Sequence, residues 1–229
     1  MSALGRPRVH VRVIGSTNDR ARALAAAGAP HGTLVTAGEQ TAGRGRQGRT
    51  WTATQGQALL CSLLLREHDA LLPLRAGLAV ADLAGPGARV KWPNDVLLDG
   101  RKLAGILVEA RPGEAWAVLG MGINVALDLS TLPPEVAARA ATLCRAPSEL
   151  DAALTELLGF LEQRLSEPPD ALLHALRARD VLLDRPVAWA GGSGTGAGID
   201  ASGALLVRRD DGTVTALHAG EVHLEDKKL

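Results

Sequence analysis

The chain has 229 residues, a formal net charge of zero and a hydrophobic fraction of 46%, which suits one domain with a small appendage and a core of Leu, Val and Ala. The balanced charge argues against a general binder of nucleic acids or membrane surfaces, and two cysteines without zinc-like Cys/His spacing exclude a disulfide framework and a zinc site. Since no leader-like segment and no apolar run of about 18 residues occur, we expect a soluble, cytoplasmic protein with no membrane partner.

The first part of the chain carries alternating strand and helix signals. Residues 9–14 alternate apolar and polar side chains, as a half-buried strand does. A helix is expected to follow, with Ser16 as its N-cap, and to run to about Ala27 before Gly28. Ser16 and Asp19 resemble a capping box in which Asp takes the usual place of Glu or Gln. Downstream we expect a strand at 33–37, a loop at 39–57, a buried strand at 57–65 and a helix at 71–83.

The second part predicts a meander of strands, then helices, then a small β module. The meander takes residues 89–92, 96–98, 102–110 and 115–124, with turns at Asp99–Gly100 and Pro112–Gly113. Helices are expected at 134–143, 148–165 and 169–179. From Arg185 the sequence becomes Gly-rich with short alternating runs, which indicates a five-stranded, barrel-like unit. The sequence therefore divides into a domain at 1–184 and a second domain at 185–229.

Lysine is rare in this chain and unevenly placed. Two of its four lysines, Lys91 and Lys102, share the segment KWPNDVLLDGRK, and the other two lie near the C-terminus. Lysine is a compact cation on a flexible stem, with a pKa that burial can lower, whereas arginine is planar and always charged. The pair suggests a site where a mobile cation meets an anion, but chance in an arginine-biased composition explains the lysines alone equally well.

The segment from Gly43 to Arg49, GRGRQGR, is the second unusual feature. Its glycines fit G-x-G-x-x-G formally, but no helix opener follows, so we reject a dinucleotide fold; no Walker-type phosphate loop occurs either. Glycines let backbone N–H groups approach an anion, arginines supply forked donors, and Trp51 offers a flat face to a heterocycle. The segment predicts a mobile anion-binding loop, with a solvated basic loop or a small RNA-binding patch as the alternatives.

Several motifs, in one order, give the chain a resemblance to the biotin protein ligases. They are Ser16-Thr17-Asn18, Gln40 before Gly43-Arg-Gly-Arg46, Trp51, Lys91-Trp-Pro-Asn-Asp95, Arg101-Lys-Leu-Ala-Gly105 within RKLAGILVE, and Gly120-Met-Gly-Ile-Asn124. The runs from Gly198 and Gly220 resemble the family's SH3-like domain. The resemblance implies an α+β fold: a mixed, mostly antiparallel sheet flanked by helices, of the class II synthetase-like, biotin and lipoate ligase type, with a small C-terminal SH3-like β-barrel.

The resemblance also implies a two-step reaction. Biotin's carboxylate attacks the α-phosphate of ATP to give biotinyl-5′-adenylate and pyrophosphate, and a carrier-protein lysine then displaces AMP. Cations must offset the charge of two anions that approach each other. By resemblance, Lys102 is the central catalytic cation, and Arg44 and Arg46 line the same anion. Mg²⁺ is expected on the triphosphate, with Asp95 near that metal or orienting Lys102.

The resemblance assigns residues to each substrate. The biotin set is Ser16, Thr17, Asn18, Gln40, Arg44, Gly45, Arg46, Lys102 and Gly105. The ATP set is Arg46, Arg49, Trp51, Lys91, Asn94, Asp95, Lys102 and Asn124. Short polar side chains suit the ureido ring, Trp51 would pack on adenine, and Asn124 would read its edge. Ser16 also fits a helix cap without any ligand, and Asn124 also fits a plain strand end.

Partners and alternatives complete these expectations. The catalytic pattern begins about ten residues after Met1, so we expect a monofunctional ligase without the helix-turn-helix of its repressor relatives, and no DNA binding. The expected protein partner is the biotin carrier protein of acetyl-CoA carboxylase. A lipoate–protein ligase of the same superfamily and a nucleotide- or RNA-binding module remain alternatives. The meander leaves an edge strand for a homodimer, and a monomer is equally compatible.

Overall fold

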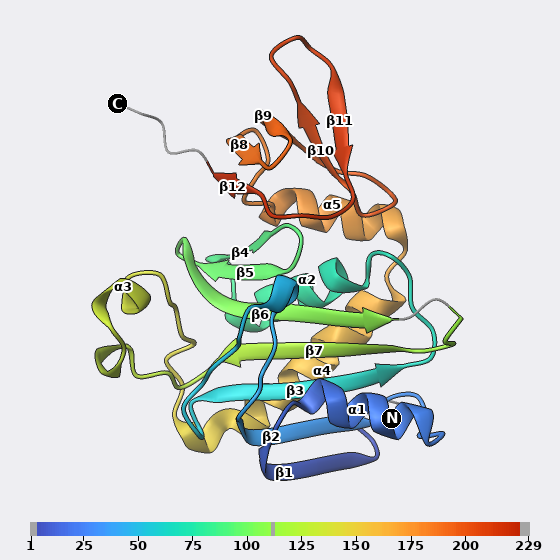
Figure 1. Cartoon of the computed structure of the whole chain (residues 1–229), viewed down its shortest axis with the longest axis vertical. Helices are drawn as coiled ribbons and strands as arrows, with labels where there is room; N and C mark the ends of the chain where they lie inside the picture. Colours follow the sequence, from blue (N-terminus) through green and yellow to red (C-terminus); the bar gives the residue numbers. More distant parts are fainter. Residues whose placement is uncertain (1–3, 111–112, 225–229) are drawn as a thin grey trace.

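The computed structural model describes residues 4–110 and 113–224 and contains two sheets with a helix between them (Figure 1). The larger sheet has seven strands in the order β1-β2-β3-β7-β6-β5-β4. They are β1 (Arg8–Ile14), β2 (Leu34–Gln40), β3 (Ala58–Leu65), β4 (Ala88–Lys91), β5 (Asp95–Leu98), β6 (Arg101–Ala110) and β7 (Ala117–Asn124). Only β1 and β2 pair in parallel, so the predicted mixed, mostly antiparallel sheet is confirmed.

Both faces of the larger sheet are covered, which explains why β3 is buried at every position. Helix α1 (Thr17–Ala26) lies on the near face in Figure 1, and α2 (Leu72–Ala84) and α4 (Leu150–Ser166) pack behind the sheet. Leu63 of β3 joins the large apolar cluster behind the sheet, whereas the neighbouring Ser62 points forward to α1. This alternation places one polar group of an apolar strand on the face where the functional cleft lies.

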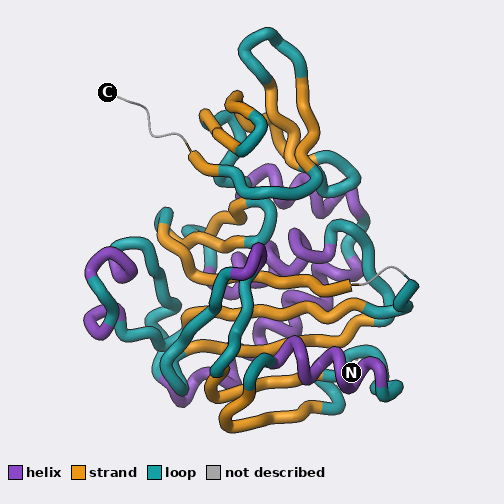
Figure 2. The backbone as a smooth tube through the Cα atoms, in the orientation of Figure 1, coloured by secondary structure: helices purple, strands orange, loops and turns teal. Residues whose placement is uncertain are grey.

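The long loop between β2 and β3 shares that near face. Residues 41–57 cross in front of the sheet as two adjacent loop segments joined by the short 3-10 turn Arg46–Gly48 (Figure 2). The predicted irregular loop is therefore confirmed, although β2 extends into its first two positions. The loop covers the middle of the sheet, beside α1.

The C-terminal region forms the predicted small β module. Its five strands, in the order β11-β10-β9-β8-β12, are β8 (Pro186–Trp189), β9 (Gly192–Ile199), β10 (Leu205–Arg208), β11 (Val214–Leu217) and β12 (His223–Leu224). Helix α5 (Pro169–Arg179) lies between this sheet and the rest of the chain (Figure 1). The indole nitrogen of Trp92 donates to the carbonyl of Gly203 at 2.9 Å, which ties the two regions together. The domain boundary near Asp184 stays a prediction, and residues 225–229 of that domain fall outside the described part.

The helix expected at 134–143 is wrong for most of its length. Helix α3 covers only Pro134–Ala137, and the chain then runs along the ends of β6 and β7. Lys102 donates its backbone N–H to the carbonyl of Arg139 at 2.7 Å, and Ala141 donates back to Lys102 at 2.8 Å. These sheet-like hydrogen bonds compete with the helix, and the tertiary partner prevails over the propensity of an alanine-rich segment.

The remaining expected elements of the larger domain agree with the structure to within a few residues. The structure also tests one expected turn and one expected helix cap. The Asp99–Gly100 turn is confirmed: both residues have positive φ, 50° and 76°, as a two-residue hairpin turn requires. Ser16 is the N-cap of α1, but its side chain makes no capping hydrogen bond, so the proposed capping box is wrong. The second expected turn includes Pro112, which lies outside the described residues.

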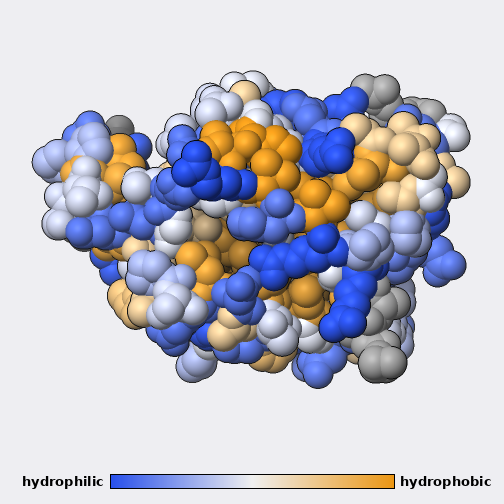
Figure 3. All heavy atoms as spheres, turned by 90° about the horizontal axis from the view of Figure 1, so that it is seen from below, coloured by the Kyte–Doolittle hydropathy of each residue, from blue (hydrophilic) through white to orange (hydrophobic). Residues whose placement is uncertain are grey.

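The edges of the larger sheet differ. The outer strand of the meander, β4, is bridged by the segment that follows α5: Val181 donates to the carbonyl of Val90 at 3.0 Å. The opposite edge, β1, alternates valines with Arg8, His10 and Arg12, and from below the surface mixes apolar patches with hydrophilic side chains (Figure 3). Charged residues on an edge oppose unwanted strand pairing. Among the described helices, none combines the length and apolarity needed to cross a bilayer.

Candidate active site

A cleft opens on the near face of the larger sheet, between α1, the 41–57 loop and the β4–β5 turn, and residues 220–223 close one side of it. Every site residue predicted from the sequence lines this cleft except Asn124. The predicted residues that line it are Ser16, Thr17, Asn18, Gln40, Arg44, Gly45, Arg46, Arg49, Trp51, Lys91, Asn94, Asp95, Lys102 and Gly105. The fold therefore brings together predicted residues that are separated by up to 89 positions, from Ser16 to Gly105.

Lys102 lies beside Asp95 in the cleft. The two residues are on adjacent strands of the β5–β6 hairpin, and Lys102 Nζ is 2.8 Å from Asp95 Oδ1. The lysine side chain is 40% exposed and the carboxylate 22% exposed, so the cation is held at the cleft surface where a ligand can reach it. Lys102 Nζ also lies 5.8 Å from the ring centre of Trp51, within the range of a cation–π contact.

Trp51 lies on a floor of two glycines. Gly105 of β6 pairs with Gly122 of β7, and a Cβ atom at either position would press against the indole ring. The bare backbone of these glycines is what allows the ring to approach the sheet. The indole Nε1 of Trp51 is buried and has no hydrogen-bond partner among the described residues. The ring therefore stands in the cleft with an unused donor.

The Gly-Arg loop is a short closed hairpin. Gly45 donates its N–H to the carbonyl of Arg49 at 2.7 Å, and Trp51 donates to Gly43 at 2.9 Å. Gln47 at the tip has a φ of 55°, in the left-handed region that glycine usually occupies. The loop is thus closed on itself by backbone hydrogen bonds at its base.

Two arginines of this loop point to opposite walls of the cleft. Arg46 Nη1 lies 3.4 Å from Asn94 Oδ1, and the Asn94 amide also donates to the carbonyl of Ile106 at 3.0 Å. Arg49 forms an ion pair with Glu221, which connects the loop to the C-terminal region. Asn94 is thereby fixed on the β4–β5 turn, and the C-terminal region contributes a carboxylate that the sequence had not indicated.

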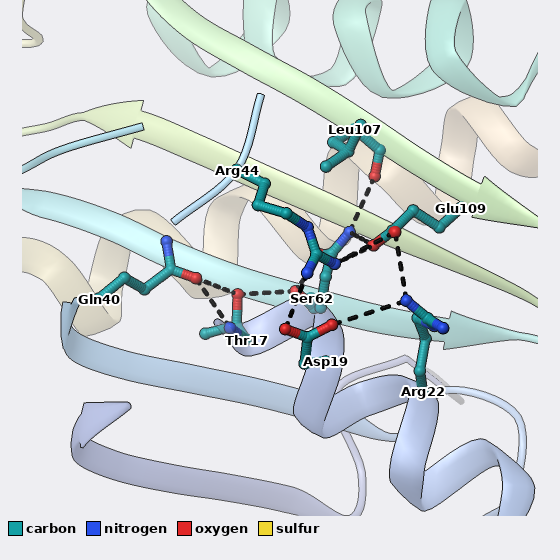
Figure 4. Close-up of polar contacts among 9 residues, drawn as sticks. Thr17, Asp19, Arg22, Gln40, Arg44, Ser62, Leu107 and Glu109 are labelled. Atoms are coloured by element: carbon teal, nitrogen blue, oxygen red, sulfur yellow. Dashed lines mark hydrogen bonds and ion pairs between the residues drawn. The ribbon is translucent and has the colours of Figure 1, made fainter. Parts of the chain in front are cut away.

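The other end of the cleft contains a chain of buried hydrogen bonds (Figure 4). Thr17 donates its N–H and its hydroxyl to Gln40 Oε1, at 2.8 and 3.0 Å. Ser62 Oγ lies 2.8 Å from Thr17 Oγ1 and 2.6 Å from Asn18 Oδ1. Two polar groups remain without protein partners among the described residues: the hydroxyl of Ser16 and the amide nitrogen of Gln40. These groups are the ones that a polar ligand could engage there.

Asn18 and Arg44 line the cleft, but their side-chain polar groups bond to other residues of the protein. Asn18 Nδ2 donates to Glu109 Oε2 at 2.7 Å and lies 3.4 Å from the carbonyl of Leu107. Arg44 donates to Asp19 at 2.8 Å and to Glu109 at 3.0 and 3.1 Å (Figure 4), and the hydrogen bond to the Asp19 carboxylate raises the pKa of this guanidinium. In this structure Arg44 faces two carboxylates and not the anion site that the sequence suggested.

Asn124 lies outside the cleft. Its amide is buried and donates to the carbonyl of Ala141 at 2.9 Å and to that of Lys102 at 3.5 Å. It therefore joins β7 to the extended segment 139–143, which is a structural role. Its expected contact with adenine stays a prediction.

Sequence reasoning missed Ser62 and Glu109. Ser62 is the one hydroxyl in the apolar run ALLCSLLL, and a buried polar residue in such a run needs a partner. Glu109 ends the RKLAGILVE motif and lies on the same strand, β6, as Lys102. Cys61, next to Ser62, is inert, because burial raises the pKa of its thiol to about 12.

Comparisons with known proteins agree with this geometry. Residues 10–125 match the biotin/lipoate A/B protein ligase family. A bifunctional ligase/repressor BirA of Bacillus subtilis is 32% identical over 96% of this chain and 75% of its own length, and a biotin–[acetyl-CoA-carboxylase] ligase of Mycobacterium tuberculosis is 39% identical over 72% of this chain and 60% of its own length.

Solved structures give the same answer. A biotin protein ligase from Aquifex aeolicus, in complex with biotin and ATP, superimposes with a TM-score of 0.81 at 26% identity, over 96% of this chain and 99% of that one. The similarity therefore extends across both sheets. On the family match, the identities and the shared architecture, the chain belongs to the biotin/lipoate A/B protein ligase family.

Proposed function

We propose that the protein is an ATP-dependent biotin ligase, which activates biotin as biotinyl-5′-adenylate and transfers it to a lysine of a carrier protein. One observation carries this proposal: a single cleft joins unpartnered polar groups of Ser16 and Gln40 to the cations Lys102, Arg46 and Lys91. A molecule with a polar ring at one end and a carboxylate at the other fits such a cleft. The relatives that bind biotin and ATP support the same choice.

In the first step the biotin carboxylate attacks the α-phosphorus of ATP. A new P–O bond forms, the bond to the β-phosphate oxygen breaks, and pyrophosphate leaves with the electron pair. Lys102, which pairs with Asp95 in this structure, would move on its flexible stem to the oxygens of the carboxylate and phosphate. Arg46 would add its charge from the loop, and Arg49 and Lys91 would face the departing phosphates.

Mg²⁺ fits the donors of this site. No cluster of three or more metal-ligating side chains occurs in the described ranges, and a nucleotide-bound Mg²⁺ needs only one or two carboxylates together with the phosphates. Asp95 is the cleft carboxylate that would hold the ion, once Lys102 has turned to the substrates. When bound, the ion supplies charge that neutralises the triphosphate.

The ureido ring of biotin would sit between α1 and the end of β2. Its carbonyl accepts and its N–H groups donate, and Gln40 Nε2 and Ser16 Oγ offer one group of each kind there. Trp51 would stack on adenine, while Gly45 and Gly105 would be close backbone contacts of biotin. In this assignment Asn18 does not contact biotin directly and instead bonds to Ser62, which lies beside Thr17.

In the second step the amine of the carrier lysine attacks the carbonyl carbon of the adenylate. A C–N bond forms, the C–O bond to phosphate breaks, and AMP leaves. We propose the biotin carrier protein of acetyl-CoA carboxylase as the acceptor and the cytoplasm as the location. The lack of DNA binding and the choice between monomer and homodimer stay predictions, to be tested by gel shift on a biotin-operon promoter and by sedimentation.

One incubation tests the proposed function. The protein is mixed with ATP, Mg²⁺ and either biotin or lipoate, and acyl-adenylate and pyrophosphate are measured. We expect adenylate with biotin and little with lipoate, because lipoate lacks the ureido group that Ser16 and Gln40 would engage. Adenylate with lipoate alone would contradict the proposal and favour the lipoate ligase.

A further inference from the structure

Glu109 occupies the junction between the loop and the polar end of the cleft. It lies on β6, its side chain is 26% exposed, and one carboxylate serves two different segments. Glu109 Oε2 accepts from Asn18 Nδ2 at 2.7 Å, while both of its oxygens accept from Arg44 Nη2 at 3.0 and 3.1 Å. Figure 4 shows Arg44 reaching down from the loop to this carboxylate.

The contact with Asn18 fixes the buried end of the cleft. The orientation of the Asn18 amide is fixed by partners at both of its ends, because the nitrogen needs acceptors and the oxygen needs a donor. Glu109 and the Leu107 carbonyl supply the acceptors, and the Ser62 hydroxyl at 2.6 Å supplies the donor. The same Ser62 hydroxyl lies 2.8 Å from the Thr17 hydroxyl, which donates its own proton to Gln40. One chain of short polar contacts thus runs from Gln40 through Thr17, Ser62 and Asn18 to Glu109.

The contact with Arg44 fixes the loop. Arg44 follows Ala42 by two residues, and Ala42 donates its N–H to the carbonyl of Gly15, just before α1. Asp19 gives Arg44 a second carboxylate contact at 2.8 Å. The Asp19 side chain is 52% exposed and that of Glu109 is 26% exposed, so Glu109 is the better shielded partner. Shielding from water strengthens an ion pair, and charge-assisted bonds to arginine are directional.

We propose that Glu109 is a positioning residue, which holds the 43–49 loop against the sheet through Arg44 and at the same time orients Asn18. The loop is therefore docked before any substrate arrives, and the docked loop and the polar end of the cleft depend on the same carboxylate. This inference deepens the proposed function, on which its consequence rests: a docked loop would retain biotinyl-5′-adenylate until the carrier protein arrives.

The first test needs no substrate. Trypsin cleaves after Arg46 and Arg49 only when the loop opens, and the cleavage rate follows the population of the open state. We expect Glu109→Gln to speed cleavage at these two bonds by about threefold to tenfold. Asp19→Asn should have a smaller effect. Asp151→Asn, which removes the exposed carboxylate on α4 that pairs with Arg8 of β1, is the matched control and should leave the rate unchanged.

A double-mutant cycle separates positioning from general stability. In an Arg44→Gln background, where cleavage is already fast, adding Glu109→Gln should cause no further increase at the same two bonds. Unchanged cleavage in Glu109→Gln, or equal increases with and without Arg44, would overturn the proposal. If Glu109→Gln does not fold, Asp19→Asn and Arg44→Gln decide, and unchanged cleavage in Arg44→Gln overturns it.

A second readout concerns the reaction intermediate. With biotin, ATP and Mg²⁺, Glu109→Gln should release more biotinyl-5′-adenylate into solution than the wild type, by about the same factor as the trypsin result. Faster cleavage without extra adenylate release would overturn the link between docking and retention. Failure of the wild type to form any adenylate would refute the proposed function and leave the docking result standing, so the two failures are distinguishable.

Discussion

The two ends of the cleft are built differently. At the end that we propose for biotin, Thr17 and Asn18 are 4% exposed and Ser62 is fully buried, and short side chains hold one another by hydrogen bonds. At the end that we propose for the phosphates, the side chains of Lys102 and Arg49 are 40% and 61% exposed and pair with carboxylates at the surface. A neutral ring is recognised by groups that are already in place, whereas phosphates that move during a reaction need long cations that can move with them.

This difference predicts where substitutions act most strongly. Removing a buried hydrogen bond costs the desolvation of the group left behind, while an exposed ion pair contributes little to stability and is screened by salt. Changes at the buried end should therefore alter stability and biotin affinity together. Changes at the exposed end should alter catalysis with little effect on folding.

Lys102→Arg should have the largest effect on activity. The planar guanidinium cannot follow the carboxylate and phosphate oxygens as an ammonium group does. The activation free energy of adenylate formation should therefore rise by about 2 kcal/mol or more, which lowers the rate about thirtyfold or more. Single-turnover formation of adenylate measures the effect. The control Arg101→Lys changes the same chemistry at an exposed neighbour outside the cleft and should be neutral. Near-wild-type rates in Lys102→Arg would remove Lys102 from the central role.

Gly120→Ala should disturb the buried end most. A Cβ atom there would collide with the Asn18 amide, which cannot shift without breaking its bonds to Ser62 and Glu109. We expect a loss of about 1–3 kcal/mol in the free energy of unfolding and weaker biotin binding. Urea unfolding and calorimetric titration with biotin measure both. The control Gly159→Ala lies in α4, where an added Cβ meets nothing, and should stabilise by about 0.5–1 kcal/mol.

Ser62→Ala tests the same end of the cleft by removing a hydrogen-bond donor, whereas Gly120→Ala adds a clashing atom. It leaves Asn18 Oδ1 without a donor, and we expect a loss of about 1–2 kcal/mol in unfolding free energy, with a matching loss of biotin affinity. Ser166→Ala, an exposed serine at the end of α4, is the control and should be neutral. An unchanged biotin affinity in Ser62→Ala would show that the buried chain does not prepare the ring site.

Glu221→Gln should have the smallest effect. Its partner Arg49 is largely exposed, so unfolding free energy should change by less than about 1 kcal/mol. At low salt, KM for ATP should change by a small factor, and the difference from wild type should disappear near 1 M salt. Glu156→Gln, which removes the partner of Arg145 at the surface, serves as the control. A salt-independent change in KM would mean that the two ends of the cleft do not differ in the way described.

The sequence predicted most of the site because the relevant residues come in contiguous motifs. Asp95, which ends KWPND, and Lys102 of RKLAG lie on the two paired strands β5 and β6, so the hairpin places the two side chains near each other. The helix expected at 134–143 failed for the opposite reason, since distant strands supplied better partners for its backbone than the helix itself. The motif did not predict that the Asn124 amide donates to Ala141, because a motif position does not say which way a side chain points.

Local patterns thus determined the order of strands and helices, the small C-terminal β module, the Asp99–Gly100 turn and the set of motifs that meet at the cleft. Only the tertiary structure decided that Arg44 binds Glu109 and Asp19, that Ser62 supports Asn18, and that Glu221 reaches Arg49. Hydrophobic period and turn chemistry act over a few residues, whereas the partner of a charged or buried polar side chain is chosen by which distant segments the sheet places beside it.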